Sequence, residues 1–166
     1  MLKALPALLV MIAALSLSAC GTYRPLYGKG PDGVNVAASL ASMSVQEQHT
    51  RAGQLLRNEL LDGSASGQQR YALSLVVTEK VIDVATLSSS SATRRRYNLS
   101  AHYELIDTQS SKPVTSGESF SNVEFDTVNV PVSDLQAADN AKARAAKELG
   151  QDIRLRLAAF ISTQKS

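Results

Sequence analysis

Two places in the sequence carry residues that could do chemistry: a single thiol near the start of the chain and a run of three arginines in its middle. Cys20 is the only cysteine in the chain, so it has no disulfide partner within it. Its thiol is therefore available as a nucleophile. The arginines are Arg94, Arg95 and Arg96, and their planar guanidinium groups are well suited to binding phosphate.

The residues before the thiol form a secretion signal. Lys3 is followed by an apolar run from Ala4 to Leu17, and the small residues Ser18 and Ala19 stand directly before Cys20. A positive start, a short apolar stretch and small residues before a cleavage point are typical of a secretory signal. The apolar run is too short to span a membrane comfortably, which takes about 20 apolar residues.

The end of this signal, Leu17-Ser18-Ala19-Cys20, is similar to the lipobox of bacterial lipoproteins. In that motif the thiol receives a diacylglyceryl group, the signal is cut off before the cysteine, and the new amine is acylated. The resemblance implies that residues 1–19 are removed and that Cys20 is the lipid anchor. An Asp after the cysteine favours retention in the inner membrane of enteric bacteria, so Gly21 indicates the outer membrane. The alternative is an ordinary secretory signal with a chance cysteine.

The remainder of the chain is long enough for one domain with a real core. We expect residues 20–33, which are rich in Gly, Pro and Tyr, to form a lipidated connector, and residues 34–166 to form a single domain. The chain has 17 Lys and Arg against 15 Asp and Glu, and this near balance gives no reason to expect nucleic acid as a partner.

The first part of the domain predicts a strand and a helix. Residues 34–43 are a weak strand candidate. Ser44 and Glu47 fit a capping box at the start of a helix, apolar residues behind them recur at helical spacing, and Asp62 with Gly63 ends that helix.

Three consecutive strands are predicted next. The first, from Tyr71 to Val84, changes the phase of its apolar residues near Thr78 and Glu79, which indicates a bulge there. The serines of residues 88–91 predict a turn. In the clearest strand, residues 97–105, apolar and polar residues alternate, so one face of the sheet is covered and the other is wetter. Residues 114–125 form the third strand.

The last element is a long amphipathic helix from Asp134 to Ser162, with Ser133 as its cap. The element order is then β-α-β-β-β-α. Two helices with apolar stripes can cover one face of an antiparallel sheet. The predicted fold class is therefore α+β: a two-layer sandwich with a mainly antiparallel sheet of about four strands and two helices packed on one face.

No pattern in the sequence points to catalysis. His49 and His102 lack companions at metal-ligand spacing, and the chain has no G-x-S-x-G elbow, no HExxH and no phosphate-binding glycine loop. We expect no enzymatic activity, no metal, and no cofactor apart from the covalent diacylglyceryl and N-acyl lipid on Cys20.

Two stretches resemble a known family. Residues 20–28, CGTYRPLYG, resemble the CGFxPLYG start of the lipopolysaccharide-assembly lipoproteins, the LptE family, in its alphaproteobacterial branch. Residues 51–60, RAGQLLRNEL, are similar to the GQxLRNxL stretch of that family's first helix. The order of elements also matches. Thr22-Tyr23 departs from the family pattern, in which Phe-x is commoner, by moving the aromatic residue one position.

The resemblance implies a non-enzymatic outer-membrane lipoprotein that faces the periplasm. Members of the family sit inside the lumen of the lipopolysaccharide-assembly β-barrel, an LptD-like partner. They plug this barrel and assist the insertion of lipopolysaccharide into the outer leaflet. Two alternatives stay open: an auxiliary lipoprotein of another envelope lipid-transport system, and a cell-envelope hydrolase.

The same resemblance gives the arginine run a candidate ligand. In a strand, Arg94 and Arg96 share the polar face with Asn98, whereas Arg95 points to the opposite face. Lipid A carries phosphates, so our hypothesis is that Arg94 and Arg96 contact lipid A phosphate. The alternative is a solvated turn end, or charges that contact the barrel wall. The cations of the last helix are more simply a solvated face.

Overall fold

The computed structural model describes residues 35–62, 69–86 and 93–164. The predicted signal (1–19), the connector (20–33) and the turn at residues 88–91 lie outside these ranges. In chain order the elements are α2 (Val36–Ala41), β1 (Met43–Val45), α3 (Arg51–Leu61), β2 (Tyr71–Thr86), β3 (Thr93–Asp107), β4 (Lys112–Thr127) and α4 (Pro131–Thr163).

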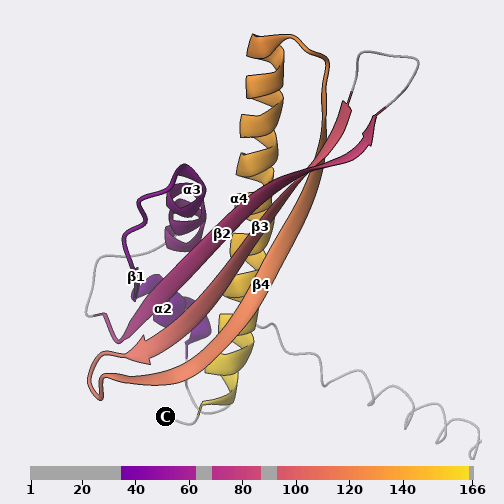
Figure 1. Cartoon of the computed structure of the whole chain (residues 1–166). Coiled ribbons are helices and arrows are strands. Elements are labelled where there is room, and N and C mark those ends of the chain that lie inside the picture. Colours follow the sequence, from indigo (N-terminus) through magenta and orange to yellow (C-terminus); the bar gives the residue numbers. More distant parts are fainter. Residues whose placement is uncertain (1–34, 63–68, 87–92, 165–166) are drawn as a thin grey trace, which may run out of the picture.

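The strands form one sheet in the order β1-β2-β3-β4. The short strand β1 runs parallel to β2, whereas β2, β3 and β4 are joined as antiparallel neighbours. Figure 1 shows α4 lying across the back of the sheet, with α2 and α3 beside it. The predicted α+β architecture of a four-stranded, mainly antiparallel sheet with helices on one face is confirmed.

The alternation that predicted β3 divides the sheet into two faces. Leu99 and Leu105 point towards the helices and are completely buried; this is the inner face. Ser100 and His102 lie on the opposite, outer face and remain accessible to solvent. Burial of one leucine side chain contributes roughly 1.5–3 kcal/mol, so period-two alternation fixes which face the helices cover.

Helix α4 supplies the other half of the core. Leu149, Ile153 and Leu157 recur at intervals of four residues and are completely buried. Leu56 of α3 is also fully buried, because α3 packs beside α4. These side chains form a single core with the inner face of the sheet.

The predicted strand at residues 34–43 is wrong. Most of it is the helix α2, and the strand β1 begins only at Met43. Val36 and Leu40 are both buried and are four residues apart, which places them on one helical face. The side chain of Asn35 caps this helix by accepting a hydrogen bond from the N–H of Ala38.

The predicted cap of the next helix is also wrong. Ser44 lies in β1, where its hydroxyl donates to the carbonyl of Tyr71. The cap is Thr50, whose side chain accepts a hydrogen bond from the N–H of Gly53 at 3.1 Å. The N–H of Gln46 is bonded to the carbonyl of Leu73, so pairing with β2 keeps the backbone extended where the capping box was expected.

The predicted bulge in β2 lies further along the strand. Pairing with β3 is continuous through Thr78 and Glu79, and the register shifts between Asp83 and Ala85. The side chains of Glu79 and Val81 continue the inner-face alternation but are exposed. The apolar pattern therefore weakens because none of the helices in the described part of the chain covers this part of the inner face.

Helix α4 begins three residues before the predicted start. Pro131 occupies the first turn and Val130 precedes it without a side-chain cap. Proline is favoured at this position because its missing N–H would have no helical partner. Ser133 therefore lies inside the helix, and the carboxylate of Asp134 accepts a hydrogen bond from the N–H of Val128 at 2.8 Å.

Polar contacts on the inner face hold α4 against β4. The buried hydroxyl of Ser119 donates to the carboxylate of Asp152, and that of Ser121 donates to Glu148 at 2.6 Å. The hydrogen bond from Ser119 lowers the pKa of Asp152, and the neighbouring Arg156 acts in the same direction. Both serines are small enough for the helix to approach the strand closely.

Gly117 provides a third close approach on the inner face. A methyl group at this position would lie 2.6 Å from the phenol oxygen of Tyr103, and the ring of Tyr103 is buried. We predict that Gly117→Ala lowers the free energy of unfolding in urea by about 1–3 kcal/mol, since the rigid ring must move.

The matched control for this substitution is Ser116→Ala, an exposed position in the same strand. It should change the free energy of unfolding by less than about 0.5 kcal/mol. Equal stabilities of the two variants would show that Tyr103 does not constrain Gly117.

Candidate functional site

The predicted phosphate-binding residues lie at one end of the sheet, which we call the distal end. It comprises residues 81–86 of β2, 93–96 of β3, 124–130 at the end of β4, and the first turns of α4, residues 131–135. Figure 1 shows this end at the top of the molecule, whereas α2, β1 and the connection between β3 and β4 lie at the opposite end.

Arg94 and Arg96 lie on the outer face, as the alternation predicts, but both are already paired. Arg94 donates two hydrogen bonds to Asp126, at 3.0 and 3.4 Å, and Arg96 donates two to Glu124, at 3.2 and 2.6 Å. Each carboxylate lies directly opposite its arginine in the register of β3 and β4. These are the cross-strand pairs of opposite charge that stabilise antiparallel sheets.

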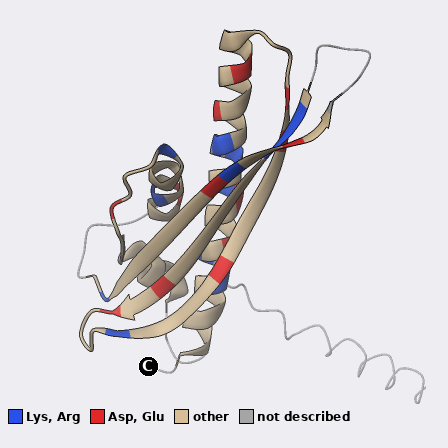
Figure 2. Cartoon of the chain, in the orientation of Figure 1, with Lys and Arg blue, Asp and Glu red and all other residues tan. Residues whose placement is uncertain are grey.

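Arg95 points the other way and pairs within the sheet as well. Its Nε donates to Asp83 of β2 at 2.9 Å. We call the six residues the arginine cluster, and Figure 2 shows its basic and acidic segments next to one another at the distal end. Its members are Arg94, Arg95, Arg96, Asp83, Glu124 and Asp126.

The ion pairs of the arginine cluster are accessible to water. The side chains of Arg94 and Asp126 are about half exposed. The hydrogen bond from Arg94 lowers the pKa of Asp126, and the same contact raises the pKa of Arg94. Exposed pairs add little to stability, so these carboxylates neutralise the arginines locally without locking them in place. An arginine also has five N–H donors, more than either carboxylate uses.

Exposed apolar side chains surround this charged cluster. Large apolar side chains on β2, on the connection after β4 and on the start of α4 are 41–77% exposed: Val81, Val84, Val128, Val130, Val132 and Leu135. A soluble surface seldom gathers this much apolar area without a partner. The distal end therefore combines guanidinium donors with apolar side chains, a combination that suits an amphiphile carrying an anionic group.

A groove lies between the edge of β4 and α4. It has a volume of about 540 Å³ and is lined by Phe125, Ala137, Asn140, Ala143 and Arg144. Arg144 donates from Nη2 to the backbone carbonyl of Glu124 at 3.2 Å. Sequence reasoning assigned the cations of this helix to a solvated face. The structure corrects that prediction for Arg144, which contacts the sheet, and for Arg154, which donates to the backbone carbonyls of Glu59 and Asp62 at the end of α3.

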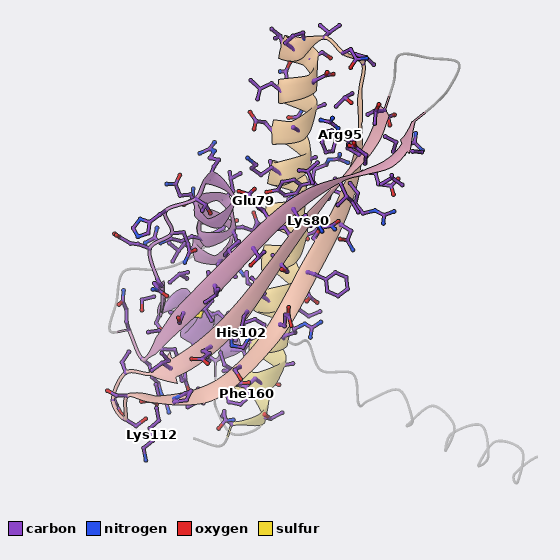
Figure 3. The ribbon with its side chains drawn as sticks, viewed as in Figure 1. Glu79, Lys80, Arg95, His102, Lys112 and Phe160 are labelled. Atoms are coloured by element: carbon purple, nitrogen blue, oxygen red, sulfur yellow. The ribbon has the colours of Figure 1, made fainter. Side chains whose placement is uncertain are left out.

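Neither histidine takes part in a recognisable site. His102 lies on the outer face of β3, 3.6 Å from the carboxylate of Glu104 (Figure 3), and His49 borders a small polar pocket at the start of α3. Among the described residues, no group of three or more His, Cys, Asp or Glu could hold a metal ion. Within the same ranges, no helix is long and apolar enough to cross a membrane. Cys20 lies outside the described residues.

The fold is shared with several solved proteins. A candidate lipoprotein from Caulobacter crescentus CB15 is 24% identical, with a TM-score of 0.68, over 78% of this chain and 97% of its own. A minor lipoprotein from Acinetobacter baumannii is 15% identical, with a TM-score of 0.52, over 70% and 91% of the two chains. Lipoprotein B from Nitrosomonas europaea is 13% identical, with a TM-score of 0.51, over 73% and 84%.

Comparisons that use the sequence alone find no relative. No family model matches the chain, and no curated protein is significantly similar to it. The structural similarity therefore defines a class by architecture, a four-stranded α+β sandwich found in proteins described as lipoproteins.

The pairing of Arg94 with Asp126 predicts how the titration of Asp126 and the stability of the fold respond to a substitution of Arg94. Replacing Arg94 by Gln should raise the pKa of Asp126 towards its ordinary range, which an NMR titration of the carboxyl carbon can measure. A carboxylate with a lowered pKa stabilises the fold above its unfolded pKa and loses that contribution as the pH falls through its folded pKa. Arg94→Gln should remove this contribution, so the variant should have a slightly lower thermal midpoint than the wild type at neutral pH, and the difference should disappear as the pH falls through the folded pKa.

The matched control is Arg95→Gln, because Arg95 contacts Asp83 on the other face of the sheet. This variant should leave the titration of Asp126 unaltered. If Asp126 titrates identically in the wild type and in Arg94→Gln, the cross-strand pair does not persist in solution.

Proposed function

We propose that this protein is an outer-membrane lipoprotein of the LptE type, which partners and plugs the lipopolysaccharide-assembly β-barrel and assists the insertion of lipopolysaccharide. The motif at residues 20–28 and the helix at residues 51–60 support this assignment. The fold supports it too, because proteins described as lipoproteins share it. The proposed role is non-enzymatic.

The lipid anchor explains how such a protein stays with its partner. Cys20 would carry the lipid, and more than one acyl chain on one residue gives stable anchoring where a single chain is marginal. Only 14 residues separate Cys20 from Asn35, the first described residue. A chain of that length reaches roughly 50 Å at most, so the anchor raises the effective concentration of the domain next to a barrel in the same membrane.

The outer face of the sheet supports a place inside a barrel. Asn98, Ser100 and Asn122 lie on this face, which carries mainly polar and charged residues along β3 and β4, with the exposed Phe120 as an apolar exception. The interior of a large outer-membrane barrel is polar. Glu124 and Asp126 already have arginine partners on this face, whereas Lys80 and Glu118 on the same face would need polar partners from the barrel wall.

The observation that carries the lipopolysaccharide part of the proposal is the composition of the distal end. Lipid A combines phosphates with acyl chains, and the distal end combines Arg94 and Arg96 with exposed apolar side chains such as Val130 and Val132. Because Asp126 and Glu124 already hold the arginines, a phosphate must compete with these carboxylates. Binding should therefore be moderate in affinity and sensitive to salt.

Co-purification tests the barrel partnership. When the full chain is tagged at its C-terminus and recovered from detergent-solubilised outer membranes, we expect the lipopolysaccharide-assembly barrel to be recovered at a 1:1 ratio. The control is residues 1–28 fused to an unrelated periplasmic domain, which should recover no barrel. Recovery of an inner-membrane ABC-type complex in place of the barrel would favour the lipid-transport alternative.

Two double variants with opposite expected effects test the phosphate contacts. Arg94→Gln with Arg96→Gln should weaken lipopolysaccharide binding about tenfold and make it less sensitive to salt, because two charge-assisted contacts are lost. Asp126→Asn with Glu124→Gln should strengthen binding, because both arginines lose their competing carboxylates. Binding is measured with purified lipopolysaccharide at two salt concentrations.

The matched control for the arginine variant is Lys142→Gln with Lys147→Gln, which removes the same charge from α4. It should reduce affinity much less than the arginine variant. Unchanged affinity and salt dependence in both distal-end variants would leave the arginine cluster as a solvated feature of the sheet and would remove the distal end as the lipopolysaccharide site.

A further inference from the structure

Strand β4 has an open edge whose orientation can be read from one side-chain contact. It is the last strand in the sheet order. The carbonyl of Glu124 accepts a hydrogen bond from Arg144 of α4, so this carbonyl points away from β3. Peptide groups alternate in direction along a strand. Those of Phe120 and Asn122 therefore also face the open edge, whereas those of Ser121 face β3.

Among the described residues, the devices that normally protect an edge strand are missing from most of this one. Proteins protect edges with proline, bulges, lysine or a covering segment. In β4 the only proline is Pro113 and the only lysine is Lys112, both at its start. The register shift opposite Leu105 and Ile106 also lies near that end, and pairing is then continuous from Thr115 to Thr127. Arg144 covers a single carbonyl of this run.

The β4–α4 groove lies beside the distal part of the edge, at Phe125, and gives room there for side chains of a strand that extends past Asn122. It runs between Phe125 on β4 and Ala137 and Ala143 on α4, so small and apolar groups line much of it. Arg144 stands in the groove, and the exposed Lys147 lies one turn further along the helix. On the other face of the edge, Phe120 is 71% exposed.

We propose that the β4 edge binds an extended peptide strand of a partner protein, with its alternate side chains in the β4–α4 groove. The main chain of the peptide would pair with the outward-facing groups of Phe120 and Asn122. Apolar side chains would enter the groove, and one carboxylate would face Arg144. This is strand addition next to a helix, a recurring mode of peptide recognition in which edge hydrogen bonds give affinity and pockets give specificity.

A second copy of this chain fits the edge less well than a single strand. Helix α4 packs more against β4 than against β3. Two β4 edges paired with each other would lie about 4.8 Å apart, whereas packed helices need about 8–10 Å between their axes. Two α4 helices beneath such paired edges would be close to this limit, while an added strand brings no helix with it.

The inference goes beyond the proposed function, since the edge and the groove lie outside the arginine cluster and the apolar side chains assigned to lipopolysaccharide. Glu124 alone belongs both to the arginine cluster and to the β4 edge. Its carboxylate pairs with Arg96, and its backbone carbonyl faces the edge and accepts from Arg144. A failure of either proposal leaves the other standing, because each is tested with different substitutions and a different ligand.

The probe is a capped seven-residue peptide of alternating valine and threonine with a central glutamate, compared with the same peptide carrying a central lysine. Binding is followed by NMR on the unlipidated full domain, residues 21–166. We expect the amide hydrogens of Phe120 and Asn122 to become protected from exchange. The amides of Ser119 and Ser121, which already pair with β3, should not change. The glutamate peptide should bind more tightly.

Two substitutions test separately the main-chain contact of the peptide with β4 and the charge of Arg144. Asn122→Pro removes one outward N–H and leaves the pairing with β3 intact, so peptide affinity should fall about fivefold or more. Asn122→Ala keeps this N–H, so its peptide affinity should stay near that of the wild type. Arg144→Glu should reverse the preference so that the lysine peptide binds better. Lys142→Glu is the control for charge, since it lies two residues away on another side of α4.

Three results overturn the proposal. The first is the absence of protection at Phe120 and Asn122 at millimolar peptide. The second is equal peptide preference in the wild type and in Arg144→Glu, which decides the matter even if Asn122→Pro fails to fold. The third is a concentration-dependent dimer, seen by sedimentation, that Asn122→Pro abolishes, because the occupant of the edge would then be a second copy.

Discussion

The packing of α4 on the inner face of the sheet is the interaction on which the rest of the structure depends. The helix has 33 residues and β3 and β4 have 15 and 16, so helix and strands are each roughly 50 Å long. One helix can therefore cover two strands from end to end. Alanines such as Ala141 and Ala145, both fully buried, let the helix lie close to the sheet.

The second helix is too short to do the same for β2. With 11 residues, α3 covers roughly 16 Å, about a third of that strand. The inner face of β2 is therefore open beyond Val77, where Glu79 and Val81 are exposed. This mismatch in length explains why the β2 part of the distal end is exposed. The open edge of β4 has a different origin, because β4 is the last strand in the sheet order.

Long periodic elements could be predicted from the sequence, whereas short elements and contacts between strands could not. The alternation of β3 and the helical stripe of α4 extend over many residues, so a local mistake does not change their assignment. Helix α2 has only six residues, and its two buried ones, Val36 and Leu40, suit a strand or a helix equally well. Thr50 and Ser44 are both good caps, and only the pairing of Gln46 with Leu73 decides between them.

The carboxylate partners of the arginines could not be predicted from the sequence for a further reason. The alternation puts Arg94 and Arg96 on the polar face, but the residues opposite them depend on the register of β3 and β4. That register is set at the connection after Asp107, where Ser111 adopts a positive φ of 54° and the pairing shifts near Leu105. Moving the register by one residue would put Phe125 in place of Glu124. The acids of β4 could be seen in the sequence, while their assignment to particular arginines could not.

Glu124 shows how closely the arginine cluster and the β4 edge both depend on the register of β3 and β4. Its side chain holds Arg96 on the outer face, and its carbonyl holds Arg144 at the edge. A single residue thus positions one cation of the distal end and one cation of the groove. Because its side chain and its peptide group point in different directions, a ligand can displace the first contact without breaking the second. The two proposed surfaces therefore depend on different groups of Glu124: the arginine cluster on its carboxylate and the β4 edge on its backbone carbonyl.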